Sequence, residues 1–139
     1  MNRTLEALLR IREHGKRHAR LQLIEAESAR IDQEKAIDKT RHRVDVARRS
    51  AEDDPASMAR YHAFRLRMEM VQRRQERELM SRERQVTERR ESLRHAARDS
   101  RVVELVIENR EREAFEQARR DEDALMNELG VQAWWRQSA

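Results

Sequence analysis

The segment AEDDPAS (residues 51–57) decides the fold of this chain, because it contains the single proline. Asp54 is suited to be a helix N-cap, since its carboxylate can accept hydrogen bonds from free backbone N–H groups. Pro55 is suited to the first helical position, where its missing N–H leaves no helix hydrogen bond unmade. Because only two glycines interrupt the rest of the 139 residues, the segment predicts a bend at 51–54 between two long helices.

Helix breakers are so rare that the expected helices have simple bounds. The first helix is expected at about 4–50, where Gly15 costs only about 1 kcal/mol relative to alanine. The second is expected at about 55–129, because Gly130 is suited to a left-handed C-terminal cap. Residues 130–139 would then form a tail. At a rise of 1.5 Å per residue the two helices would be roughly 70 and 110 Å long.

The composition favours a coiled coil over a compact domain. Charged residues make up 42% of the chain and aromatic residues 4%. So few large apolar residues cannot fill a globular core, whereas long helices commonly have this profile. The absence of cysteine fits a reducing compartment, and the longest apolar cluster, VVELVI at 102–107, is far too short to span a membrane. We therefore expect a cytoplasmic protein with no segment inserted in a membrane.

The charge pattern argues against a nucleic-acid partner. Lysine and arginine total 31 and aspartate and glutamate total 27, which gives a net charge of +4. Acidic residues interrupt the arginine runs, so no continuous basic surface is predicted to follow a phosphate backbone. A solvated, ion-paired coiled-coil surface is the favoured interpretation, and a nucleic-acid-binding coiled coil is the less favoured alternative.

An apolar heptad repeat runs along both expected helices, with spacings that alternate between three and four as a coiled-coil seam requires. Short connections join antiparallel neighbours, so the fold class is predicted to be all-α: one long antiparallel two-helix coiled-coil hairpin over residues 1–139, with the second helix overhanging. Arginine and glutamine interrupt the repeat, which indicates a flexible hairpin. The expected seam consists of Leu5, Leu9, Ala19, Leu23, Ala26, Ile37, Val44, Ala47 and Ala51 with Met58, Tyr61, Met68, Leu79, Val86, Leu93, Ala96, Val103, Ile107 and Ala114.

The overhang is expected to need a partner. Folding at residue 53 pairs the start of the first helix with about residue 104 and leaves nearly 40 Å of the second helix unpaired. Apolar side chains on an unpaired helix suggest that another protein covers them. The Trp134–Trp135 pair is either part of a disordered tail or a partner anchor. The apolar residues of the overhang are Ile107, Ala114, Phe115, Ala118, Leu125, Met126 and Leu129.

No enzymatic site is expected. A two-helix hairpin has no enclosed pocket, and the sequence lacks a nucleotide-binding loop or a nucleophile motif. His14 and His18 are one helical turn apart and could contact a metal ion together. Because Gly15 replaces the glutamate of the zinc-protease motif and no third ligand is near, two solvated histidines are the favoured interpretation. We expect no catalytic residue, no metal and no cofactor.

A stripe just past the bend has two interpretations. Phe64 and Val71 lie beside the seam, and Met68 and Gln75 lie on it, so the four share one helical face. In one interpretation the hairpin buries this stripe as a wider seam. In the other the stripe is an exposed patch near the bend for a partner to bind. The residue pattern alone leaves both open.

Three segments together resemble a known family. They are LEALLRIREHGKRHARLQL at 5–23, RYHAFRLRMEMVQ at 60–72, and REREAFEQARRDEDALMNELG at 110–130, which closes on Asn127 and Glu128. In order, spacing and length they are similar to the flagellar export protein FliJ family and its injectisome counterparts of the YscO type.

The resemblance implies a non-enzymatic stalk of a type III export ATPase, as part of flagellar protein export and motility. The end that carries both chain termini would insert into the hexameric ATPase ring and promote its assembly and turnover. The stalk would also contact the export-gate membrane protein from the cytoplasmic side and, in the flagellar case, bind export chaperones. The alternatives are a coiled-coil chaperone for secretion substrates and an injectisome stalk of the YscO type.

The resemblance also assigns residues to these contacts. In the family the first helix adds apolar and aromatic residues beside the gate-binding face, whereas this chain offers Thr40, Arg43 and Ala47 there. The implied gate-binding residues are Phe64, Met68, Val71 and Gln75. The implied ring-binding residues are Leu5, Leu8, Leu9, Arg112, Phe115, Arg119, Arg120 and Asp123.

Overall fold

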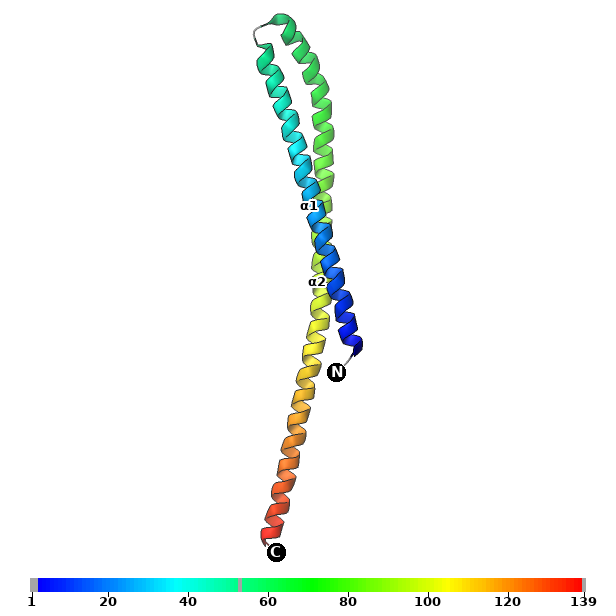
Figure 1. Ribbon diagram of the computed structural model, residues 1–139, viewed down its shortest axis with the longest axis vertical. Coiled ribbons are helices and arrows are strands. Elements are labelled where there is room, and N and C mark those ends of the chain that lie inside the picture. The colour runs from blue at the N-terminus through cyan, green and yellow to red at the C-terminus, as the bar shows by residue number, and fades with distance from the viewer. Residues whose placement is uncertain (1–2, 53, 139) are drawn as a thin grey trace.

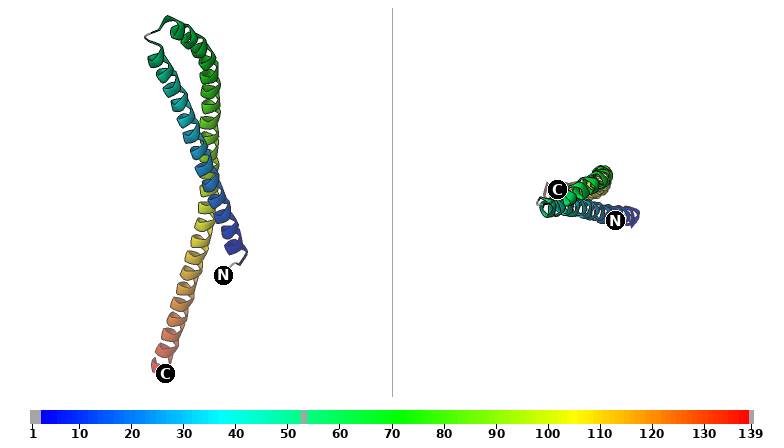
Figure 2. Two further views of the ribbon diagram at one scale, coloured as in Figure 1. Left: turned by 45° about the horizontal axis from the view of Figure 1, so that its top comes forward. Right: turned by 90° about the horizontal axis from the view of Figure 1, so that it is seen from above.

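Two long helices make up the described part of the protein. The computed structural model describes residues 3–52 and 54–138, in which α1 runs over Arg3–Ala51 and α2 over Pro55–Ser138. The helices pack antiparallel, and α2 continues far past the start of α1 (Figure 1). Both ribbon figures show the helices farther apart near the bend and near the start of α1 than at mid-length (Figure 2). The predicted all-α hairpin with an overhanging second helix is confirmed.

The bend forms where the proline predicted it, and Asp54 caps α2. The Asp54 carboxylate accepts hydrogen bonds from the Ala56 backbone N–H at 3.2 Å and from the Ser57 hydroxyl at 2.9 Å. The backbone N–H of Met58 donates to the Asp54 carbonyl at 2.9 Å, which closes the first helical turn. These donors, the Ser57 hydroxyl first, hold the pKa of Asp54 below its ordinary value. Asp53, in the middle of the expected bend, lies outside the described residues.

The core is a narrow line of small side chains between the two helices. Alanine, valine and serine occupy most of its buried positions, so the helices approach closely but bury little apolar area per turn. Most other members of the expected seam are half-buried, whereas Ala114 is exposed because it lies beyond the end of α1. The buried positions are Ala19, Ala26, Ile37, Thr40, Ala51, Val86, Ser100 and Val103.

Polar contacts across the seam fix the register of the hairpin. Glu13 bonds to Ser100 and Gln22 to Arg89, and the Gln33 side chain reaches the Gln75 backbone carbonyl. The last half-buried residue of α2 is Ile107, three residues beyond the expected end of pairing near residue 104. The difference arises because the first turns of α2 arch over the bend before the two helices run side by side (Figure 1).

The C-terminal end of α2 corrects two expectations. α2 does not end at Leu129 but continues through Gly130 to Ser138. Gly130 does not have the positive φ that a left-handed cap requires. Glycine inside a helix costs only about 1 kcal/mol, and no proline follows to stop the helix. The expected tail at 130–139 is therefore helical as far as Ser138, and Ala139 lies outside the described residues.

Candidate functional site: an apex stripe and a free arm

The apex stripe, which we define as Phe64, Met68, Val71 and Gln75, is half-buried along its whole length. Gln75 is bound to α1: its amide N–H donates to the Thr40 hydroxyl at 2.8 Å and to the Ala36 carbonyl at 3.5 Å. Thr40 in turn donates to the Ala36 carbonyl at 3.1 Å. Gln75 therefore contributes to the packing of the hairpin, as the wider-seam interpretation expects.

Phe64 borders a hollow at the bend end of the hairpin. The hollow measures about 260 Å³ and lies between the two helices. The α1 residues that line it are Ala47, Ser50 and Ala51, whose short side chains leave the space beside Phe64 and Tyr61 unfilled. Arg43, one of the three first-helix residues expected beside this face, is exposed. Phe64 therefore has open space next to it.

The free arm, which we define as residues 108–138 of α2, projects alone beyond the hairpin (Figure 1). Each of its residues is exposed, including Phe115 at 70%. Trp134 and Trp135 lie near its end with their rings edge to face, 5.4 Å apart at 78°. Because they lie on helix, the disordered-tail interpretation of this pair is wrong. The other large apolar side chains of the arm are Leu125, Met126, Leu129 and Val131.

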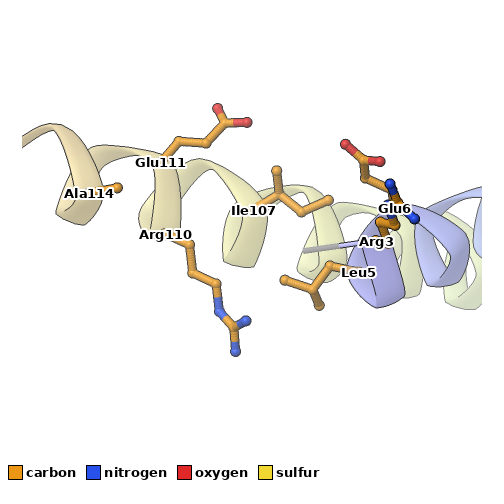
Figure 3. A pocket seen from close by; sticks show the side chains of 7 residues that line it. All are labelled: Arg3, Leu5, Glu6, Ile107, Arg110, Glu111 and Ala114. Carbon is orange, nitrogen blue, oxygen red and sulfur yellow. The ribbon is translucent and has the colours of Figure 1, made fainter. Parts of the chain in front are cut away.

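A hollow of about 640 Å³ marks the junction where α1 begins and the free arm departs. Leu5 of α1 and Ile107 of α2 lie on opposite sides of it, and Ala114 extends its apolar lining along α2 (Figure 3). Arg3, Glu6, Arg110 and Glu111 form the charged rim. The hollow exists because α2 continues past the point at which α1 can cover it.

The expected ring-binding residues divide between the start of α1 and the free arm. Leu5, Leu8 and Leu9 are half-buried at the start of α1. The remaining members extend along the exposed arm, so the structure places them all at the end of the hairpin away from the bend but does not bring them into one cluster. Those arm residues are Arg112, Phe115, Arg119, Arg120 and Asp123.

The charged side chains of the free arm differ from those of the paired part of the hairpin in how they are partnered. The paired part of the hairpin has ion pairs within and between helices, such as Arg12–Asp99 at 3.7 Å and Arg90–Glu27 at 3.5 Å. Among the described residues, none from Asn109 onward takes part in an ion pair of this kind. The one side-chain hydrogen bond within the arm is donated by Gln117 to Asp121 at 3.0 Å. Its charges are thus available to a partner.

A polar contact at the base of the arm was missed by the sequence reasoning. The Ser100 hydroxyl is 1% exposed and donates to the Glu13 carboxylate at 2.6 Å. This bond, with Lys16 and Arg17 nearby, holds the pKa of Glu13 below its ordinary value although partial burial opposes the shift. The available signal was the position of Ser100, which continues the heptad line from Leu93 to Ile107.

The described residues were searched for metal-binding side-chain groups and for membrane-spanning stretches. No three side chains of histidine, aspartate or glutamate in the described ranges come together in a way that could hold a metal ion, and His14 and His18 are both exposed. Within the same ranges, neither helix has a stretch apolar enough to span a membrane.

The fold and these surfaces define a class of protein: a two-helix coiled-coil hairpin whose second helix extends as a solvent-exposed arm. The family described as the flagellar FliJ protein matches residues 1–139, the whole chain. The chain therefore belongs to the FliJ family and is a flagellar export-related protein. No curated protein and no solved structure matched the chain.

Proposed function

We propose that this protein is a non-enzymatic central stalk of the flagellar type III export apparatus. The free arm is the observation that carries the proposal. A continuous helix that projects roughly 45 Å beyond its neighbour has the shape needed to enter the pore of a ring. Its exposed apolar side chains and unpaired charges supply contacts that no other part of the described chain satisfies.

In this proposal the ring is the hexameric export ATPase, and the stalk promotes its assembly and turnover. Phe115 provides an apolar contact, while Arg112, Arg119, Arg120 and Asp123 pair with charges on the ring subunits. Leu5, Leu8 and Leu9 support the base of the arm, because they pack on α2 where the arm departs. The mechanism is mechanical: one asymmetric helix contacts six subunits unequally and so biases their states.

The opposite end of the hairpin is the proposed contact for the export-gate membrane protein. Phe64 carries this part of the proposal, because the hollow beside it leaves room for a partner's side chain. Met68 and Val71 extend the apolar surface, and Gln75 positions the stripe through its bonds to α1. The protein would then act in the cytoplasm, at the inner face of the membrane that carries the gate.

The test is ATP hydrolysis by the export ATPase of the same organism, with the full chain and with a truncation after Arg110. This truncation keeps every residue of α1 and its whole contact surface on α2, so circular dichroism should show an intact hairpin. We expect stimulation by the full chain and little or none by the truncation. Equal stimulation by both would contradict the assignment to the arm. Stimulation by neither, with a ring-competent ATPase, would favour a coiled-coil chaperone for export substrates.

A further inference from the structure

The two helices are packed unevenly along the length of the hairpin. We define the bend-side segment as residues 41–51 of α1 together with residues 55–74 of α2. Ala51 is the only buried residue of this segment, and α2 has no buried residue before Val86. Because most of the stability of a long helix comes from packing an apolar face, the bend-side segment is the least stabilised part of the paired hairpin.

Polar contacts between the helices follow the same division. Among the described residues of the bend-side segment, each side-chain hydrogen bond and ion pair lies within one helix or at the cap of α2, as Arg48–Asp45 does at 3.7 Å. The opposite half of the hairpin has bonds from helix to helix, such as Ser100 to Glu13 at 2.6 Å. In the bend-side segment, separation of the helices therefore breaks no such bond.

The seam of the bend-side segment is also incompletely filled. The hollow of about 260 Å³ is lined by Ala47 and Ala51 from α1 and by Tyr61 and Phe64 from α2. Atoms that face an unfilled space lose the dispersion contacts that would otherwise hold the two sides together. The ribbons are correspondingly farther apart at the bend than at mid-length (Figure 2).

A polar cluster marks the place where contacts between the helices begin. The Gln75 amide donates to the Thr40 hydroxyl at 2.8 Å, and the Gln33 amide donates to the Gln75 backbone carbonyl at 3.0 Å. Thr40 is buried. Farther along the seam, Arg30 and Arg82 each form an ion pair with a glutamate of their own helix. The Gln75 cluster, defined as Gln33, Thr40 and Gln75, is therefore the first polar connection between the helices beyond the bend.

We propose that the bend-side segment opens as one unit while the rest of the hairpin stays paired, and that the opening stops at the Gln75 cluster. Units of low stability that open separately from the remaining structure are a general property of proteins. Helices as short as these are marginal in water without a partner, so each opening also loosens their backbone hydrogen bonds. The bend-side segment is thus a conformational switch with a closed and an open state.

The opening regulates access to the apex stripe. Phe64, Met68 and Val71 are half-buried in the closed hairpin, and separation of α1 from α2 exposes the faces that now point to α1. A partner that binds these faces selects the open state, and its apparent affinity falls in proportion to the population of that state. This consequence rests on the proposed gate contact. The opening does not, because it is a property of the free chain and is tested without a partner.

Hydrogen exchange of the free, full chain measures the opening. Amides at 41–51 and 61–74 should exchange at least roughly tenfold faster, after correction for sequence, than amides at 16–27 and 86–96. These four ranges are all helical and all lie in the paired part of the hairpin. Equal protection of the four ranges would overturn the proposal.

Two variants test whether the segment opens as a unit. Val44→Ala removes methyl groups from the seam of α1 and should speed exchange by roughly threefold or more, to the same degree at 41–51 and at 61–74. Ala47→Leu adds methyl groups beside the hollow and should slow exchange in both ranges. Acceleration by Val44→Ala that is confined to α1, or that extends equally to 86–96, would contradict a separate unit.

Paired spin labels test whether the helices move apart, and the natural chain has no cysteine to interfere. Val46→Cys with Leu66→Cys reports on the bend-side segment. Val46 precedes Ala51 by five residues and Leu66 follows Tyr61 by five, and Ala51 and Tyr61 line the same hollow from opposite helices. Val46 and Leu66 are both exposed, so labels there leave the seam intact.

The control pair is Ile24→Cys with Thr87→Cys, on the other side of the Gln75 cluster. Both residues are exposed, and each is two positions from a member of the bonded pair Gln22–Arg89. We expect one narrow distance distribution for the control pair and a broad or two-component distribution for the bend-side pair. Equally narrow distributions, or a control pair as broad as the bend-side pair, would overturn the proposal.

Discussion

Asp54 and Glu13 show how single carboxylates hold the two ends of the hairpin. Asp54 starts α2 by binding the Ala56 N–H and the Ser57 hydroxyl, and Glu13 ties α1 to α2 through Ser100. Both carboxyls have a lowered pKa, with the serine hydroxyl as the first cause in each case. Each is therefore more readily ionised in the folded chain than in the unfolded chain.

The lowered pKa values of Asp54 and Glu13 predict how the stability of the fold depends on pH. A carboxyl with a lowered pKa stabilises the fold fully above its unfolded value, roughly pH 4, and loses that contribution as pH falls through the lower folded value. We expect the double variant Glu13→Gln, Asp54→Asn to melt at a lower temperature than the natural chain at neutral pH. The difference should shrink as the pH falls below about 4. Thermal melts followed by circular dichroism test this, and a difference that grows in acid would contradict it.

At the scale of the element, the seam of small side chains concentrates stability in few positions. Ile37 is 6% exposed, whereas Ile31, in the same helix, is 42% exposed. Ile37→Ala removes buried methyl groups and leaves a cavity, so it should lower the free energy of unfolding by about 2 kcal/mol. Ile31→Ala should change it by less than about 0.5 kcal/mol. Urea unfolding measures both, and equal effects would mean that the seam is wrongly placed.

The continuation of α2 through Gly130 gives a second prediction for the element. Because Gly130 has no positive φ and a Cβ there would meet no atom within 4 Å, alanine should fit without strain. Gly130→Ala should stabilise the end of the arm by up to about 1 kcal/mol. Hydrogen exchange of the amides at 131–138 should slow. Faster exchange would indicate that Gly130 caps the helix in the left-handed conformation, as the sequence pattern suggested.

At the scale of the whole molecule, the protein is a long two-helix hairpin with the bend at one end and the free arm at the other. The sequence predicted the hairpin because one proline, two glycines and a heptad repeat leave few other folds. It did not predict the end of α2, because a glycine's conformation is not determined by its neighbours. It missed Ser100 because a polar residue on a seam looks like an interruption until its partner is known. Contacts with other proteins could not be predicted from this sequence alone, because half of each contact surface belongs to another chain.

The central claim is that the arm end, and not the bend end, contacts the export ATPase. Photo-cross-linking from two matched positions tests this most directly. A benzoylphenylalanine at Phe115, which is 70% exposed, is compared with one at Leu66, which is 64% exposed. In the presence of the ATPase, we expect cross-links to the ring from position 115 and none from position 66. Cross-links to the ring from position 66 alone, or equally from both, would contradict the account.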